Sequence, residues 1–437
     1  MESENIIPFA IATIDTGCRN QILGAFRAIS ELTGNQYDSE KLFVLPKDCE
    51  NFESMKTPIN ASQFNSYKEF STYICSLLDK YMSTATVIPN IFITVYNPTE
   101  TSNAGEDADK ICRVIKEYYE RNHLGVVLTA ILTSRFHKYK YADLINIPKH
   151  LLTFSARIRL LRHKNFRKKV LITLGTVNNF HNKLVHDNYK ELSKRLSKLK
   201  NNADIKPFID KLDNYKNKTK HVVFCLGGRV ESSDILFDLS YAQHLYDEAK
   251  KLIQNGYGIV FVNGPRTPNN ITDFLYEKAK KNPNIIFQNS KKIAKDDEER
   301  QPSKWRIYSG KYEKELTTFE KIGNIYPGIL AIKNTLVVHS MDSYSSCETS
   351  SAGIPTAVSC KEIYVNPDSR YDCHNLVKLL CPKYAVDFNE FVQAACNMKI
   401  EPKDLRLNIL PSPLRIFAEM IINQLNHLCT KNIIKKK

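Results

Sequence analysis

Residues 335–360 read TLVVHSMDSYSSCETSSAGIPTAVSC and predict a complete strand–helix–strand unit. The runs TLVVHS (335–340) and PTAVSC (355–360) are short and apolar, as strands buried in a parallel sheet are. Between them the sequence predicts a loop and a short helix that holds Glu348 in its first turn and ends at Gly353. Parallel strands joined by a helix are the unit of doubly wound α/β sheets.

The same alternation of apolar runs and helical patterns extends over most of the chain. The runs are rich in Val and Ile and are not interrupted by polar residues, as expected of strands covered on both faces. In the first half they lie at 8–14, 41–45, 91–96, 125–132, 143–147 and 169–175. In the second half, three more precede the pair above, at 221–228, 258–264 and 284–288. We therefore expect an α/β protein with two doubly wound, Rossmann-like domains.

Several helices are well marked between these runs. One covers 241–253 and stops at Gly256, and another covers 271–280 after Pro268 and an Asn cap. The last begins at Ser412–Pro413, a good cap and first-turn pair.

The 437 residues are ample for two packed cores. The polar, Lys-rich segment 183–220 is interpreted as a helical connection with the domain boundary near its end. We expect a first domain over 1–205, with the helix 412–430 packing back on it, and a second domain over 206–411. The two would face each other across a cleft, as in GT-B-like proteins.

Composition narrows the possible partners. The net charge of +15 favours nucleic acid, an anionic membrane or a phosphorylated substrate, although a general bias toward Lys codons would produce the same charge. None of the eleven cysteines falls in CxxC, and no Cys/His cluster has zinc-ligand spacing. No signal peptide and no apolar run of about 18 residues is visible. We expect a cytoplasmic protein without metal or cofactor.

The loop after 335–340 is typical of a nucleotide diphosphate site. A helix N-terminus and the hydroxyls of Ser343, Ser345 and Ser346 suit phosphate. Glu348 suits a pair of ribose hydroxyls, as acidic residues do in dinucleotide-binding folds. Alternatively, Glu348 only complements the helix dipole and the serines only fill the loop.

Two further loops at strand ends favour the nucleotide interpretation. CLGGRVESSD (225–234) contains Gly227 and Gly228, which allow a ligand to approach the backbone closely. VNGPRTPNN (262–270) holds Arg266 in a rigid turn suited to phosphate. Neither loop is GxGxxG or a P-loop, which disfavours a dehydrogenase or an NTPase.

Taken together, these motifs resemble those of the mitochondrial fission ELM1-like family, whose architecture is that of GT-B glycosyltransferases. The resemblance spans most of the chain, through GCRNQILGAFRAI (17–29), ADLINIPKH (142–150), VLITLGT (170–176), CLGG (225–228), GPRTP (264–268) and NIYPGILAIKNTLVVHSMDSYSSCETSSAGIPTAV (324–358). The matching positions are Gly17, Asn20, Gln21, Gly24, Pro148, His150, Gly175, Arg266, Thr267, Pro268, Tyr326, Gly328, Leu330, Ala331, Asp342, Ser343, Ser346, Glu348, Gly353 and Pro355.

The chain also departs from this pattern. Cys18 stands where the family has His, Arg229–Val230 follow the Gly-Gly turn in place of Pro-Ser-Arg, and YNPTE (96–100) replaces an Arg pair. The resemblance is therefore stronger in the nucleotide half than in the acceptor half.

The resemblance implies a metal-independent transferase that uses a nucleotide-diphosphate sugar. The 343–346 backbone and Arg266 would stabilise the leaving diphosphate. Asp15 and His150 are the candidate bases, although His150 is interpreted equally well as a structural residue at a strand end. Gly17, Asn20 and Gln21 would lie on the acceptor side. The nucleotide side would comprise Gly227, Gly228, Arg266, Thr267, Tyr326, Asp342, Ser343, Ser345, Ser346 and Glu348.

A second hypothesis is a non-catalytic interaction protein that keeps the fold, because fold alone does not determine function. In plants the family is linked to recruiting a fission dynamin to mitochondria. Binding of a nucleotide sugar would distinguish the two hypotheses.

The run SARIRLLRHKNFRKK (155–169) interleaves basic and apolar residues. It suits an anionic membrane surface, with the protein peripheral on the inner face, or it is simply a solvated helix face. No aromatic-rich nucleic-acid motif is present, so nucleic acid is the least favoured partner.

Overall fold

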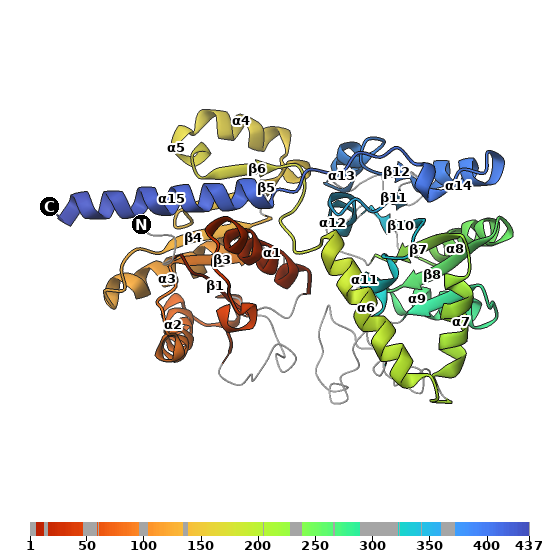
Figure 1. Ribbon diagram of the computed structural model, residues 1–437. Coiled ribbons are helices and arrows are strands. Elements are labelled where there is room, and N and C mark those ends of the chain that lie inside the picture. The colour runs from red at the N-terminus through yellow and green to blue at the C-terminus, as the bar shows by residue number, and fades with distance from the viewer. Residues whose placement is uncertain are drawn as a thin grey trace. The chain divides into compact units, whose positions relative to one another are not determined.

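The computed structural model describes residues 6–12, 16–46, 59, 61–95, 104–133, 139–203, 205–227, 238–264, 267–288, 322, 324–341, 343–359 and 372–436. The chain forms two compact units (Figure 1). The first comprises Met1–Asn179 and Pro411–Lys437, and the second comprises Phe180–Leu410. Each is built on its own six-stranded sheet.

The sheet of the first unit has the order β2-β1-β3-β4-β5-β6, and all neighbouring strands are parallel. Its strands are β1 (Pro8–Ile11), β2 (Phe43–Val44), β3 (Ile91–Val95), β4 (Leu128–Leu132), β5 (Leu144–Pro148) and β6 (Val170–Thr173). The chain goes from β1 to β2 on one side and then to β3 on the other, so the sheet is doubly wound.

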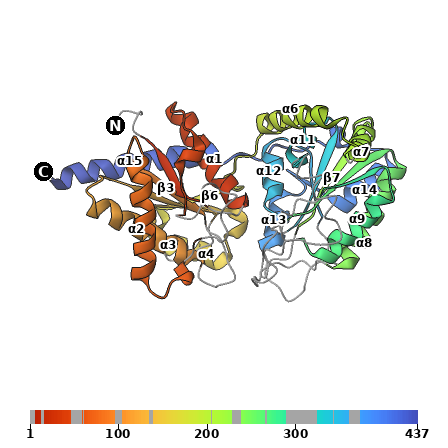
Figure 2. The same ribbon diagram turned by 90° about the horizontal axis from the view of Figure 1, so that it is seen from below.

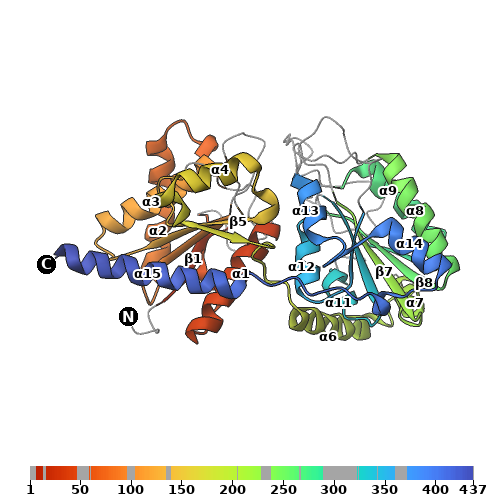
Figure 3. The same cartoon turned by 90° about the horizontal axis from the view of Figure 1, so that it is seen from above.

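Helices cover both faces of this sheet. Those on one face are α2 (Tyr67–Thr84), α3 (Ala104–Arg121) and α4 (Phe154–Arg162), the last followed by α5 (Lys164–Arg167) (Figure 2). Those on the other face are α1 (Thr16–Thr33) and α15 (Leu414–Lys436) (Figure 3). Short 3-10 turns cover Ser39–Leu42, Ala61–Gln63 and Lys149–Leu151.

The sheet of the second unit has the order β12-β11-β10-β7-β8-β9, again parallel throughout. Its strands are β7 (Lys220–Cys225), β8 (Tyr257–Val262), β9 (Ile285–Gln288), β10 (Thr335–Ser340), β11 (Thr356–Ser359) and β12 (Val386–Asp387). Its helices are α6 (Asn182–Leu199), α7 (Lys206–Lys216), α8 (Leu239–Gln254), α9 (Asn269–Lys280), α11 (Tyr326–Ile329), α12 (Ser345–Ser351), α13 (Asp372–Leu380) and α14 (Phe388–Asn397), and a 3-10 turn covers Pro402–Asp404.

The fold class expected from the sequence, two doubly wound Rossmann-like α/β domains, is confirmed by these two strand orders. Some local expectations need correction. Residues 39–42 form a 3-10 turn, so only Phe43 and Val44 of the run 41–45 are in a strand. Helix α9 is preceded by Pro268, which makes no side-chain cap, rather than by an Asn cap.

The first boundary between the units lies at Asn179 instead of 205. The reason is α6, whose buried residues Val185, Leu192 and Leu196 belong to the core of the second unit. Helix α6 also approaches α11 closely, because a Cβ atom added at Gly328 would lie 3.1 Å from the backbone oxygen of Asn188. The polar connection therefore carries an apolar stripe that packs on the second sheet.

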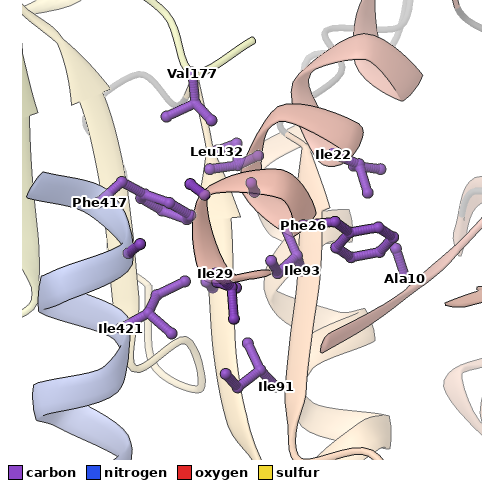
Figure 4. Packing of buried hydrophobic residues seen from close by; sticks show 14 of the residues in the cluster. Ala10, Ile22, Phe26, Ile29, Ile91, Ile93, Leu132, Val177, Phe417 and Ile421 are labelled. Carbon is purple, nitrogen blue, oxygen red and sulfur yellow. The ribbon is translucent and has the colours of Figure 1, made fainter. Parts of the chain in front are cut away.

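The C-terminal helix completes the core of the first unit. Phe417, Ala418, Ile421 and Leu425 of α15 are fully buried in one cluster with residues of α1 and the sheet. Figure 4 shows Phe417 and Ile421 directed toward the side of α1 that carries Ile29. A segment more than two hundred residues away in the sequence thus closes the first domain.

A buried carboxylate ties the segment before β5 to α3. Both oxygens of Asp109 accept backbone N–H groups, at 2.8 Å from Lys140, 2.9 Å from Tyr141 and 3.0 Å from Ala142. We expect Asp109→Ala to lower the free energy of unfolding by about 1–3 kcal/mol, because it leaves these donors without their acceptor. Urea denaturation followed by circular dichroism measures the change.

Asp107 is the matched control, since it is similarly buried on the same helix and its Oδ2 atom accepts no hydrogen bond. Asp107→Ala should therefore cost much less. An equal loss in the two variants would contradict the role assigned to Asp109.

Candidate functional site

Three strand ends of the second unit meet at one edge of its sheet. Gly227 follows β7, Asn263 and Gly264 follow β8, and Met341 follows β10. The chain runs from β7 outward to β9 and then returns to place β10 on the other side of β7. Ligands of open α/β sheets bind beyond the carboxyl ends of the strands at such a switch point.

Three side chains gather beside this switch point. Cys225 ends β7, and its thiol accepts a hydrogen bond from the hydroxyl of Tyr326, the first residue of α11. The Tyr326 ring stacks on Phe180, with centroids 6.4 Å apart. Glu348 of α12 lies close enough for its charge to act on both groups.

The electrostatics keep Cys225 and Tyr326 neutral. The pKa of Cys225 is raised to about 12, because burial and the Glu348 charge raise it by more than the hydrogen bond from Tyr326 lowers it. Burial, the interaction with Cys225 and the Glu348 charge raise the pKa of Tyr326 well above its ordinary value. A thiol that stays protonated is a poor nucleophile, so these residues offer hydrogen bonding and shape instead of covalent chemistry.

A buried histidine that was not predicted as a site residue, His339, lies beside Cys225 in the sheet. His339 of β10 is the register partner of Cys225 and is fully buried. Its Nε2 atom lies 3.1 Å from the Thr349 hydroxyl oxygen of α12, and Thr356 donates to the same oxygen at 2.9 Å. Burial lowers the pKa of His339 to about 3, so this contact joins α12 to β10 and β11 without a charge. In the sequence, the position of His339 within the apolar run 335–340 was the only indication that it is buried.

The loop serines do not all serve the role expected of them. The hydroxyl of Ser346 donates to the backbone oxygen of Ser343 at 2.8 Å, and Ser346 is fully buried. The N–H groups of Ser343, Ser346 and Cys347 donate to the backbone oxygens of Ser340, Ser343 and Tyr344, at 3.0, 3.2 and 2.9 Å. These N–H donors are therefore used within the chain, which leaves the hydroxyls of Ser343 and Ser345 as the candidate phosphate donors of this loop. Ser343 and Ser345 are half-buried, and Asp342 lies outside the described residues.

Thr267 also has a structural role. It is buried, and its hydroxyl accepts the N–H of Gly264 at 2.9 Å. The same hydroxyl donates to the backbone oxygens of Leu226, at 3.2 Å, and Gly227, at 2.9 Å. Thr267 therefore fastens the loop after β8 to the loop after β7 and positions Gly227. Gly228 and Arg266 lie outside the described residues.

In the first unit, the candidate base His150 lies in the 3-10 turn after β5 and is only 2% exposed. Burial lowers its pKa to about 3. This imidazole is neutral at physiological pH, and its surroundings disfavour the protonated form that a general base must become. Asp15, the other candidate, lies outside the described residues.

The expected acceptor-side residues Gly17, Asn20 and Gln21 lie in the first turns of α1, the first helix after β1. Gln21 Oε1 accepts a hydrogen bond from the hydroxyl of Thr133 at the end of β4. Thr133 has a φ of 50°, an unusual backbone conformation for a β-branched residue. The sequence pattern did not indicate this link between α1 and β4.

Among the residues that the structure describes, no three His, Cys, Asp or Glu side chains are grouped as metal ligands. In the same part of the chain, no helix combines the length and the apolar character needed to span a bilayer.

The sequence matches no protein-family model and no curated protein. Solved structures similar to it include UDP-GlcNAc 2-epimerase from Neisseria meningitidis bound to UDP-GlcNAc, at 12% identity and a TM-score of 0.46, covering 96% of this chain and 99% of that one. The epimerase from Methanocaldococcus jannaschii has 12% identity and a TM-score of 0.45, covering 97% and 99%. Sucrose-phosphate synthase from Thermosynechococcus elongatus has 10% identity and a TM-score of 0.41, covering 99% and 100%.

Proposed function

We propose that the second unit binds a nucleoside-diphosphate sugar at the carboxyl edge of β7, β8 and β10. The main support is the grouping of Glu348 and Tyr326 beside the switch point between β7 and β10. A half-buried carboxylate there can accept two ribose hydroxyls together. Gly227 has no side chain, so a ligand can approach the backbone after β7.

We further propose that the protein transfers the sugar to a membrane-associated acceptor. Ser343, Ser345 and Arg266 would stabilise the leaving diphosphate, and this charge stabilisation requires no metal ion. A base from the first unit would accept the proton of the attacking hydroxyl, with Asp15 a better candidate than the buried His150. The proposed transfer reaction is based on the resemblance of the sequence to the ELM1-like family, whose architecture is that of GT-B glycosyltransferases.

The low pKa of His150 also favours a second candidate, a non-catalytic interaction protein of the ELM1 type. Such a protein would keep the nucleotide half of the fold and lack an effective base. A nucleotide sugar that binds but is neither hydrolysed nor transferred would favour this candidate.

The nucleotide proposal is tested by thermal unfolding with UDP, GDP, ADP, UDP-GlcNAc, UDP-glucose and uridine, with and without EDTA. A ligand of the native state at 100 times its Kd stabilises it by about 2.7 kcal/mol. We expect at least one diphosphate to raise Tm in both conditions. Arg266→Ala should weaken the diphosphate much more than uridine, because only the former carries phosphate. A panel without a responder would contradict nucleotide binding, and loss of the shift in EDTA would contradict the metal-free site.

Glu348→Gln should weaken the responding diphosphate by about tenfold or more, since a hydrogen bond to a charged group contributes about 1.5–3 kcal/mol. Glu390→Gln is the matched control, because Glu390 is also a first-turn acid of a helix in the second unit and is exposed. If both variants bind the diphosphate as the wild type does, Glu348 only complements its helix dipole.

A further inference from the structure

Helix α4 has an inner apolar side that is buried and an outer apolar side that is largely exposed. Ala156 and Leu160 are buried on the inner side. On the opposite side, Phe154 and Leu161 are 78% and 69% exposed, and Ile158 between them is half-buried. Residues spaced by three, four and seven positions share one side of a helix, so these three form a continuous stripe. We call Phe154, Ile158 and Leu161 the outer stripe.

Arginines flank the outer stripe on both sides. At 100° per residue, Arg157 lies on one flank of the stripe and Arg162 on the other, and both are exposed. Arg159 lies farther round the helix and is also exposed. Lys168, just after α5, adds a further exposed charge. Its hydrogen bond with Gln424 uses the backbone oxygen and not the ammonium group. Arginine stems can cover apolar surface while their guanidinium groups reach phosphate oxygens.

The chain segment that carries α4 has charges of one sign. From residue 144 to Asn179, where the first unit ends, there is no aspartate or glutamate, while eight lysines and arginines occur. A basic segment of this kind attracts anions over a distance of about one Debye length, which is about 10 Å at 0.1 M salt.

We propose that the outer stripe of α4 inserts into the interface of an anionic lipid bilayer, with Arg157 and Arg162 at the level of the lipid phosphates. A nucleic-acid duplex or an acidic peptide without apolar residues would pair with the arginines but would leave the Phe154 ring in water. Only a bilayer interface offers an apolar layer directly beneath a layer of phosphates. The inference goes beyond the proposed nucleotide site and does not depend on it.

This geometry predicts two separable contributions to binding. The arginines supply an electrostatic attraction that salt screens. The outer stripe supplies a contribution from burial of apolar area, which salt does not weaken. The basic run of the sequence indicated the first contribution, whereas the second appears only when the exposed side of α4 is known.

The test is flotation of the full-length protein with vesicles of phosphatidylcholine containing one third phosphatidylserine, and with phosphatidylcholine alone. We expect binding to the anionic vesicles, weakened at high salt. Phe154→Ala combined with Leu161→Ala should weaken that binding by about tenfold or more, because each large apolar side chain loses its burial in the bilayer. Arg157→Glu combined with Arg162→Glu should weaken it by more than about fivefold per residue.

Ile416→Ala is the matched control, because Ile416 is 57% exposed next to Arg415 on another helix of the same unit. It should bind vesicles as the wild type does. All substituted side chains are exposed, and unchanged circular dichroism and Tm verify folding.

Three results with vesicles would overturn the proposal. These are absence of binding to the anionic vesicles, equal binding by the Phe154/Leu161 double variant and the wild type, and loss of binding only when Lys435–Lys437 are deleted. Tighter binding to a DNA duplex than to vesicles, unaffected by the Phe154/Leu161 change, would also reject a lipid partner in favour of a purely electrostatic surface.

Discussion

Replacing Phe417 with alanine is expected to lower the free energy of unfolding of the first unit by about 3–5 kcal/mol. The ring is fully buried in the cluster that joins α15 to α1 and the sheet. Its removal loses the transfer free energy of the ring and leaves a cavity that rigid neighbours fill only in part. A loss of this size is a large part of the stability of an ordinary domain.

Hydrogen exchange measured by mass spectrometry shows which helices and strands lose stability. Peptides from α1, α15 and β4 should exchange faster, while those from β7, β8 and β10 of the second unit should change little. Ile416→Ala, one residue earlier and exposed, should change stability by no more than about 0.5 kcal/mol. If the two variants lost the same stability, α15 would not be part of the first core.

Gly24→Ala is expected to destabilise the first unit at or beyond the upper end of the usual overpacking cost of about 1–3 kcal/mol. A Cβ atom at this position of α1 would lie 2.3 Å from the backbone carbon of Asn178 and 2.4 Å from its oxygen. These atoms are backbone and cannot rotate away. The shift would also stretch the 3.0 Å bond from the Asn179 N–H to the Asn20 oxygen.

Gly328→Ala provides a graded comparison. There the added Cβ would lie 3.1 Å from the Asn188 oxygen, a smaller overlap that a shift of a few tenths of an ångström relieves. Urea denaturation of both variants should therefore rank Gly24→Ala as clearly the more damaging. The reverse order would mean that α1 does not pass Asn178 as closely as described.

The strands in the interior of both sheets were predictable because strands buried on both faces are continuous apolar runs. The run 335–340 coincides with β10, and the run 91–96 differs from β3 by one residue. The edge strand β12, Val386–Asp387, was not predicted, because two residues form no recognisable run. The run 41–45 was predicted too long, because its first residues belong to the 3-10 turn 39–42.

The candidate site was predictable as a place but less so as a set of contacts. Strand ends followed by small polar residues indicated the edge where Gly227 and Glu348 lie. The sequence could not tell whether a hydroxyl faces a ligand or the protein, because the same group does both. Ser346 and Thr267 bond to nearby backbone oxygens, and only the path of the neighbouring loops shows this.

The sequence by itself determined the class of most local elements, because hydrophobic period, caps and glycines act over a few residues. The tertiary structure decided which core each apolar stripe enters. The stripe of α6 joins the second unit, against expectation, and that of α15 joins the first. It also decided that α4 keeps a stripe exposed and that His339 lies beneath Glu348's helix. The physical reason is that apolar burial is non-directional, so a stripe specifies that it must be covered but not by what.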